Sequence, residues 1–123
     1  MPTKCLAIAL LFAAHVTTTA AEVPAEQRHE VEHLLNFIAS TTCIIDRNGS
    51  LHNGPEALVH IKRKYAYYRD DISSTEQFIA LSASQSTFSG KAYTVRCGRG
   101  EVETTREWLL GELGEYRNQG FGM

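Results

Sequence analysis

Four stretches of the chain repeat apolar residues every three to four positions, which is typical of a helix that buries one face. They cover residues 24–40, 54–70, 74–86 and 105–117. Asn53 precedes the second stretch and is a preferred residue type for the N-cap of a helix. The side chains expected in the core are Val31, Leu34, Leu35, Ile38, Leu58, Ile61, Tyr65, Tyr68, Phe78, Ile79, Ala83, Trp108, Leu109, Leu113 and Tyr116.

Two other segments have the pattern of β-strands. Residues 43–52 hold two extended runs separated by Asn48-Gly49. Asn-Gly favours a tight hairpin because a type I′ turn needs a positive φ at both central residues. In residues 92–97, Tyr93 and Val95 alternate with polar residues, which predicts a third strand, and residues 98–101 are expected to form a loop.

The order of these elements is α-β-β-α-α-β-α, which predicts an α+β fold. We expect the hairpin of residues 43–52 and the strand of residues 92–97 to form a small antiparallel sheet. The helices would then cover one face of that sheet.

The N-terminal segment predicts export. Residues 1–21 combine a basic start, an apolar run and the small residues Thr19-Ala20-Ala21, which is typical of a signal peptide. The apolar run is shorter than the ~20 residues of a membrane span, and no second run follows it. We therefore expect cleavage near Ala21, a periplasmic or secreted protein without a membrane span, a single domain over residues 22–117 and a flexible tail over residues 118–123.

Without the leader, the chain keeps two cysteines, Cys43 and Cys97. An oxidising compartment favours a disulfide between them, which would tie the first strand to the last. A metal pair or two free thiols are the alternatives, although two cysteines alone are too few ligands for a structural zinc. The mature chain has 11 Lys and Arg against 14 Asp and Glu. Its formal charge of about −3 makes nucleic acid an unsuitable partner.

Polar residues gather on the two central helices. Glu56, His60 and Lys64 recur every four residues beside the apolar face of the second helix. A carboxylate one turn before an imidazole can orient a general base, but the same spacing is typical of a solvent-exposed charge ladder. Ser82 and Ser86 lie on the apolar side of the third helix. Their hydroxyls need partners, either carbonyls of their own helix or the polar groups of the second helix.

The first helix contains His29-Glu30-Val31-Glu32-His33, which matches the zinc-binding pattern H-E-x-x-H. At 100° per residue, both histidines fall opposite the apolar stripe of this helix. We therefore expect His29 and His33 to lie with Glu26, Glu30 and Glu32 on a solvated face rather than in a zinc site. No cofactor is expected.

Five short motifs occur in order along nearly the whole mature chain. They are Cys43-x-Ile45-x-Arg47-Asn48-Gly49, Glu56-Ala57-x-x-His60-x-x-x-Lys64-Tyr65, Glu76-x-Phe78-Ile79, Ser86-x-x-Ser89-Gly90-Lys91-x-Tyr93 and Trp108-Leu109. Together they resemble a family of small exported bacterial proteins catalogued as a domain of unknown function. The chain departs from that pattern near Ile45 and Leu51-His52, where an aromatic residue is usual. The resemblance implies a bacterial leader and one shared constellation of Glu56, His60, Lys64, Ser86 and Ser89.

Two classes of function remain open. The first is a non-catalytic binding module, such as an adaptor, inhibitor or immunity-type protein, for a periplasmic protein or a small ligand. The second is a small hydrolase that uses Ser86 or Ser89 with His60 and Glu56. The binding module is favoured because the G-x-S-x-G nucleophile elbow is absent. Its candidate binding residues are Arg47, Asn48, Glu56, His60, Lys64, Ser82, Ser86, Ser89 and Lys91.

Overall fold

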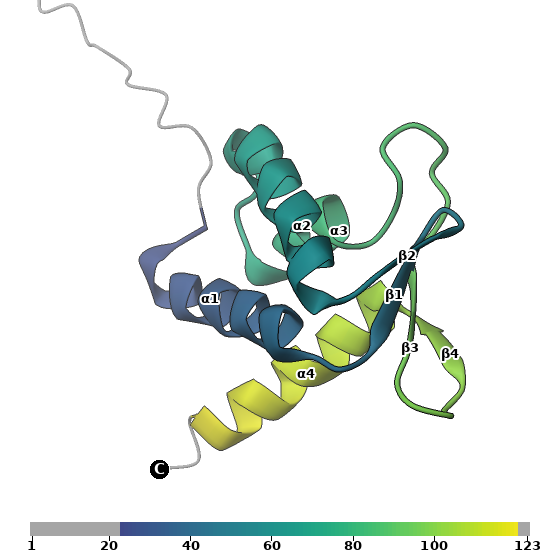
Figure 1. The fold of residues 1–123 in the computed structure, drawn as a ribbon. Helices are drawn as coiled ribbons and strands as arrows, with labels where there is room; N and C mark the ends of the chain where they lie inside the picture. The colour runs from purple at the N-terminus through teal and green to yellow at the C-terminus, as the bar shows by residue number, and fades with distance from the viewer. Residues whose placement is uncertain (1–22, 121–123) are drawn as a thin grey trace, which may run out of the picture.

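Four helices lie on one side of a four-stranded antiparallel sheet, as the computed structural model shows for residues 23–120 (Figure 1). The predicted signal peptide falls outside these described residues. The elements are α1 (Ala25–Ser40), β1 (Ile44–Arg47), β2 (Ser50–His52), α2 (Gly54–Tyr68), the short 3₁₀ helix η1 (Arg69–Asp71), α3 (Thr75–Ser82), β3 (Thr94–Arg96), β4 (Val102–Thr104) and α4 (Thr105–Gly120). The α+β class and the predicted order are confirmed, with β4 and η1 as additions.

The helices begin where local side chains satisfy their first amide groups. Asn53 and Glu56 form a reciprocal capping box at the start of α2. Ser74 caps α3 by accepting a hydrogen bond from the amide of Gln77 (3.1 Å). Pro24 precedes α1 without a side-chain cap.

The hairpin of β1 and β2 forms as the sequence predicts. Asn48 and Gly49 have φ values of 59° and 92°, the left-handed values that a type I′ turn requires. The sheet order is β2-β1-β3-β4, so β1 lies between its hairpin partner and β3. Ile45 and Val95 are paired across β1 and β3 and point into the core, while Ile44, Leu51 and Val102 are exposed.

Two boundaries differ from the sequence prediction. The helix expected to reach Ser86 ends at Ser82, and the backbone leaves the helical conformation at Ala83 (φ −134°). The hydroxyl of Ser84 then donates to the carbonyl of Ile79 (2.6 Å), and Gln85 bridges to Ala92. Residues 102–104 form β4, which pairs antiparallel with β3. The last helix continues to Gly120 and so includes residues 118–120.

Cys43 and Cys97 form the predicted disulfide, with their Cα atoms 4.3 Å apart. Cys43 precedes β1 and Cys97 follows β3, so the bond joins the ends of two paired strands. The cysteines are 54 residues apart. Closing such a loop stabilises the fold by roughly 4 kcal/mol in the chain-entropy model.

The core lies between the helices and the inner face of the sheet. Its most deeply buried side chains include Leu34, Ile38, Phe78, Ile79 and Leu109. The apolar stripes predicted for the helices contribute to it, with Leu35, Leu58, Tyr65, Tyr68 and Trp108 only partly buried at its edge. Within residues 23–120, no helix is long and apolar enough to cross a membrane.

Candidate functional site

A small cavity lies where α2, the end of α3, β1 and the start of α4 meet. Its volume is about 10 Å³, roughly the space of one water molecule. The polar side chains along it are those of Arg47, His60, Lys64, Ser82, Tyr93 and Thr105. Apolar side chains complete the wall, namely Ile38, Ile45, Ala57, Ile61, Ala83, Trp108 and Leu109.

The polar residues that line the cavity come from different strands and helices. Arg47 is the last residue of β1, immediately before the hairpin turn. His60 and Lys64 lie one turn apart on α2, and Ser82 is the last residue of α3. Tyr93 precedes β3 and is 4% exposed. The cavity therefore joins the hairpin to the polar edge of α2, two features that are separate in the sequence.

Several buried polar atoms at this site have no hydrogen-bond partner in the described part of the chain. They are Nε of Arg47, Oγ of Ser82 and Nδ1 of the neighbouring His52. Ser82 is fully buried. A buried donor without a partner lowers the free energy of unfolding by about 1 to 3 kcal/mol, so such atoms are rare in native proteins.

Two cations lie against the aromatic ring of Tyr93. The guanidinium carbon of Arg47 is 5.3 Å from the ring centroid, and Nζ of Lys64 is 5.1 Å from it. Lys64 also donates to the carbonyl oxygen of Gln85 (2.5 Å) and to the hydroxyl of Tyr93 (3.5 Å). The electron-rich face of the ring attracts both cations and keeps them at the cavity.

The imidazole of His60 lies in an apolar and positively charged environment. Burial lowers the pKa of His60 below its usual value, and the nearby charge of Arg47 lowers it further. Its ring packs edge-on against that of His52, with the centroids 5.3 Å apart. The neutral form of His60 is therefore favoured, which suits hydrogen bonding more than charge pairing.

Glu56 takes part in the cap of α2 rather than orienting His60. One of its carboxylate oxygens accepts from the amide of Asn53 (3.4 Å), and the other lies 3.6 Å from Nδ1 of His52. Among the described residues, no hydrogen bond joins His60 to a carboxylate or a serine. The base and orienter arrangement of a hydrolase is therefore not assembled here.

The loop between α3 and β3 holds the remaining candidates. The hydroxyl of Ser86 accepts from the amide of Ser89 (3.4 Å), and the hydroxyl of Ser89 accepts from the amide of Lys91 (3.2 Å). These serines close the turn through their own loop. Lys91, like Asn48 at the hairpin tip, is exposed. Of the predicted site residues, the cavity brings together Arg47, His60, Lys64 and Ser82.

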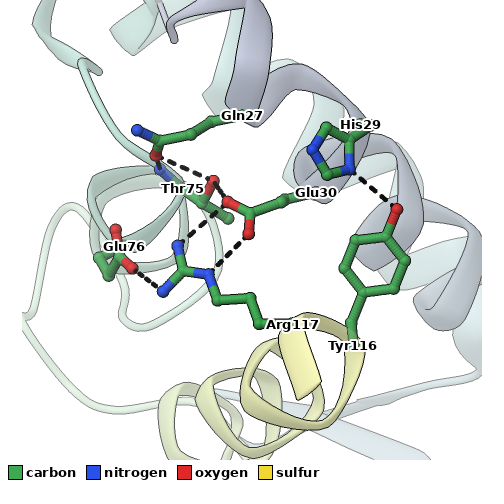
Figure 2. A network of polar contacts seen from close by, with 7 residues as sticks. All are labelled: Gln27, His29, Glu30, Thr75, Glu76, Tyr116 and Arg117. Carbon is green, nitrogen blue, oxygen red and sulfur yellow. Dashed lines mark hydrogen bonds and ion pairs between the residues drawn. The ribbon is translucent and has the colours of Figure 1, made fainter. Parts of the chain in front are cut away.

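A second polar cluster surrounds Glu30 of α1 (Figure 2). Arg117 of α4 donates to both carboxylate oxygens of Glu30, at 2.6 and 3.0 Å, and also pairs with Glu76 of α3 (2.6 Å). The hydroxyl of Thr75 donates to Glu30 as well (2.7 Å). The hydrogen bond from Arg117 lowers the pKa of Glu30, although burial opposes it. The expected solvated position of Glu30 is wrong, because this residue is 4% exposed and joins three helices.

The two histidines of the H-E-x-x-H pattern both contact side chains of α4. Nδ1 of His29 lies 2.9 Å from the hydroxyl of Tyr116, and Nε2 of His33 lies 2.8 Å from Glu112. The ring of His33 stacks on that of Tyr116 with the centroids 4.0 Å apart. His29 is exposed, as predicted, whereas His33 is only partly exposed because α4 packs beside α1. No group of three potential metal ligands occurs within residues 23–120.

Sequence reasoning missed three side chains at these sites. His52 and Tyr93 were assigned only to strands, and Arg117 was not considered. A signal existed for Glu30, which lies one turn before Leu34 and two turns before Ile38 on the buried side of α1. No comparable signal existed for the cavity, because its walls come from elements far apart in the chain.

A family model matches nearly the whole of the described fold. The model of a family described as "Family of unknown function (DUF5329)" matches residues 25–117. A curated relative, "Uncharacterized protein YfeK" from Salmonella typhimurium (strain LT2), is 36% identical over 91 residues, which are 72% of this chain and 72% of that protein. No solved structure matches the chain.

Proposed function

Because this chain belongs to the DUF5329 family, whose function is unknown, its role must be inferred from its site, and we propose that it is a non-catalytic binding module exported to the periplasm or beyond. Export is supported by the leader pattern of residues 1–21 and by the disulfide, since such bonds persist in oxidising compartments. The bound partner is a periplasmic protein or a small ligand.

The observation that carries this proposal is the set of unpaired polar atoms at the cavity. A purely structural cluster would satisfy its buried donors, because each unpaired donor weakens the fold. Here Nε of Arg47 and Oγ of Ser82 are buried without partners in the described chain. A bound group that accepts their hydrogen bonds accounts for their retention.

The same arrangement supports binding over catalysis. A serine hydrolase needs its nucleophile within hydrogen-bond reach of a base, and the base needs an orienting group. Ser82 and His60 do line one cavity, but Glu56 serves the cap of α2, and Ser86 and Ser89 serve their own turn. The hairpin end and α2 together offer a surface for recognition.

His60→Ala tests the proposal. Mature wild-type protein and variant would be used to capture partners from a periplasmic extract, with Lys62→Ala as the matched control, because Lys62 is exposed on the same helix. We expect the captured partner to fall at least about tenfold for His60→Ala, while its melting temperature stays within a few degrees of wild type.

Two results would overturn the binding role of this site. One is a His60→Ala protein that melts several degrees lower yet captures the same partner. The other is labelling of the wild-type protein by a fluorophosphonate probe that disappears in Ser82→Ala, which would instead indicate a nucleophilic serine.

A further inference from the structure

The charges around the cavity are unbalanced. Arg47 and Lys64 both line it, and no Asp or Glu does so among the described residues. Neither cation forms an ion pair within residues 23–120. Glu56, one turn before His60 on α2, does not line the cavity; its side chain is 56% exposed and lies 3.6 Å from Nδ1 of His52. Two cations held against one ring repel each other, and an anion placed between them would relieve that repulsion.

The unpaired atoms of the cavity include donors. The Nε–H of an arginine can only donate, and the hydroxyl of a serine donates readily to a charged acceptor. These are the groups left without partners at Arg47 and Ser82. Lys64 already donates to Gln85, so it supplies charge beside the cavity as well as a further donor. A ligand that suits these groups is therefore an acceptor that carries negative charge.

The size of the cavity limits the shape of that acceptor. Its volume of about 10 Å³ admits about one water molecule, or one oxygen of a ligand, unless side chains move. A planar carboxylate can place one oxygen inside and the other against Arg47, whereas a tetrahedral phosphate presents more bulk. The apolar wall formed by residues such as Ile61 and Leu109 strengthens the attraction between opposite charges.

We infer that the cavity binds a carboxylate group, held by the guanidinium of Arg47, the ammonium of Lys64 and the hydroxyl of Ser82. This inference rests on the proposed binding function and names the chemical class of its ligand. The carboxylate belongs either to a small free acid or to the chain end of a peptide or protein. In both cases the rest of the ligand lies outside the cavity, along the hairpin and α2.

Tryptophan fluorescence offers a direct test, because Trp108 is the single tryptophan of the chain and lines the cavity. Acetate and N-acetylalanine would be titrated into the mature protein, with acetamide, N-acetylalanine amide, phosphate and sodium chloride as matched controls. We expect a saturable change with the two carboxylates and with none of the amides. Equal affinities indicate a free acid, and an affinity at least about tenfold higher for N-acetylalanine indicates a chain end.

Charge-removing variants locate the binding. Arg47→Met and Lys64→Met should each weaken carboxylate binding at least about tenfold, and Lys62→Met should leave it unchanged. Two variants are used so that a folding defect in one does not decide the result. The inference is overturned by the absence of saturation up to about 100 mM carboxylate, by equal binding of phosphate, or by unchanged binding in both variants.

This experiment separates the ligand class from the binding function. If His60→Ala loses its captured partner while carboxylates fail to bind, the proposed binding function is supported and the assignment of a carboxylate ligand is rejected. If carboxylates bind through Arg47 but no partner depends on His60, the assignment of a carboxylate ligand is supported and binding of a macromolecular partner at this site is rejected.

Discussion

Two regions of this small protein bury polar groups in different ways. Around Glu30, a buried carboxylate receives hydrogen bonds from Arg117 and Thr75, so its charge and its acceptors are satisfied. Around the cavity, Arg47 and Ser82 keep buried atoms without partners in the described chain. The first arrangement is complete within the protein and joins three helices. The second leaves donors unpaired within the described chain, and this is the observation on which the proposed binding role rests.

The difference between the two clusters predicts which residues stabilise the fold and which ones bind a ligand, even though the ligand is not identified. Removing a member of a satisfied network leaves another member orphaned and weakens the fold. Removing Nε of Arg47 or the hydroxyl of Ser82 leaves no hydrogen-bond partner behind in the described chain, so it should weaken binding instead. Substitutions in the two regions therefore have opposite signatures.

The largest effect is expected from Arg117→Met. It leaves the carboxylate of Glu30, whose side chain is 5% exposed, without its cation. We expect the free energy of unfolding to fall by about 3 kcal/mol, at the low end for a broken buried pair because the side chain of Arg117 is 39% exposed. Urea unfolding followed by circular dichroism measures the loss. The double variant Glu30→Leu with Arg117→Met should recover most of it.

Arg47→Met is the matched substitution in the other region. It removes a cation that has no carboxylate partner among the described residues, so we expect a loss below about 1 kcal/mol in the same urea assay. Arg106→Met serves as the baseline, because Arg106 is exposed on α4. A loss at Arg47 equal to that at Arg117 would contradict the distinction between the two regions.

Lowering the pH is expected to reduce the free energy of unfolding by a smaller amount. The hydrogen bond from Arg117 lowers the pKa of Glu30, and burial lowers the pKa of His60. In both cases the unfolded state binds a proton at higher pH than the folded state, so stability falls as pH decreases. The loss should begin as pH falls below 6.5 for His60 and below 4.5 for Glu30.

Urea midpoints measured between about pH 8 and about pH 3 would resolve these two steps. His60→Gln should remove the upper step, and Glu30→Gln should flatten the lower one. An upper step that persists in His60→Gln would assign it to another group.

The smallest expected difference in stability is between the alanine variants of Ser82 and Ser84. Ser84→Ala removes a hydroxyl that donates to the carbonyl of Ile79, and we expect a loss of about 1 kcal/mol. Ser82→Ala removes a fully buried hydroxyl without a partner, and we expect no loss or a gain of up to about 1 kcal/mol. Melting temperatures of the two variants give the answer. Equal losses would mean that the hydroxyl of Ser82 is satisfied in the protein.

Local signals predicted most of the fold. Asn48-Gly49 predicted the hairpin, Asn53 predicted the start of α2, and the two mature cysteines predicted the disulfide. Strand β4 was not predicted, because it has only three residues before a helix and so short a segment shows no clear alternation of apolar and polar positions. It exists through its pairing with β3.

The end of α3 and the burial of Glu30 also depended on contacts that local patterns do not contain. A helical wheel extends the apolar side of α3 through Ser86, but the backbone leaves the helix at Ala83 and Gln85 pairs with Ala92 instead. Glu30 shares the buried side of α1 with Leu34 and Ile38, but a carboxylate is buried only where a partner satisfies it. It is buried because Arg117, from the other end of the chain, supplies its partner.

By itself, the sequence determined the helices, the hairpin and the disulfide, because caps, turns and apolar periodicity act over a few residues and cysteine pairing followed from their number. It also marked His60, Lys64 and Ser82 as polar groups at an apolar seam. Only the tertiary structure decided that Arg47 joins them, that Ser86 and Ser89 serve a turn, and that Glu30 belongs to a closed network. Those outcomes depend on which distant side chains meet in the packed core, and that is settled by the geometry of several elements at once.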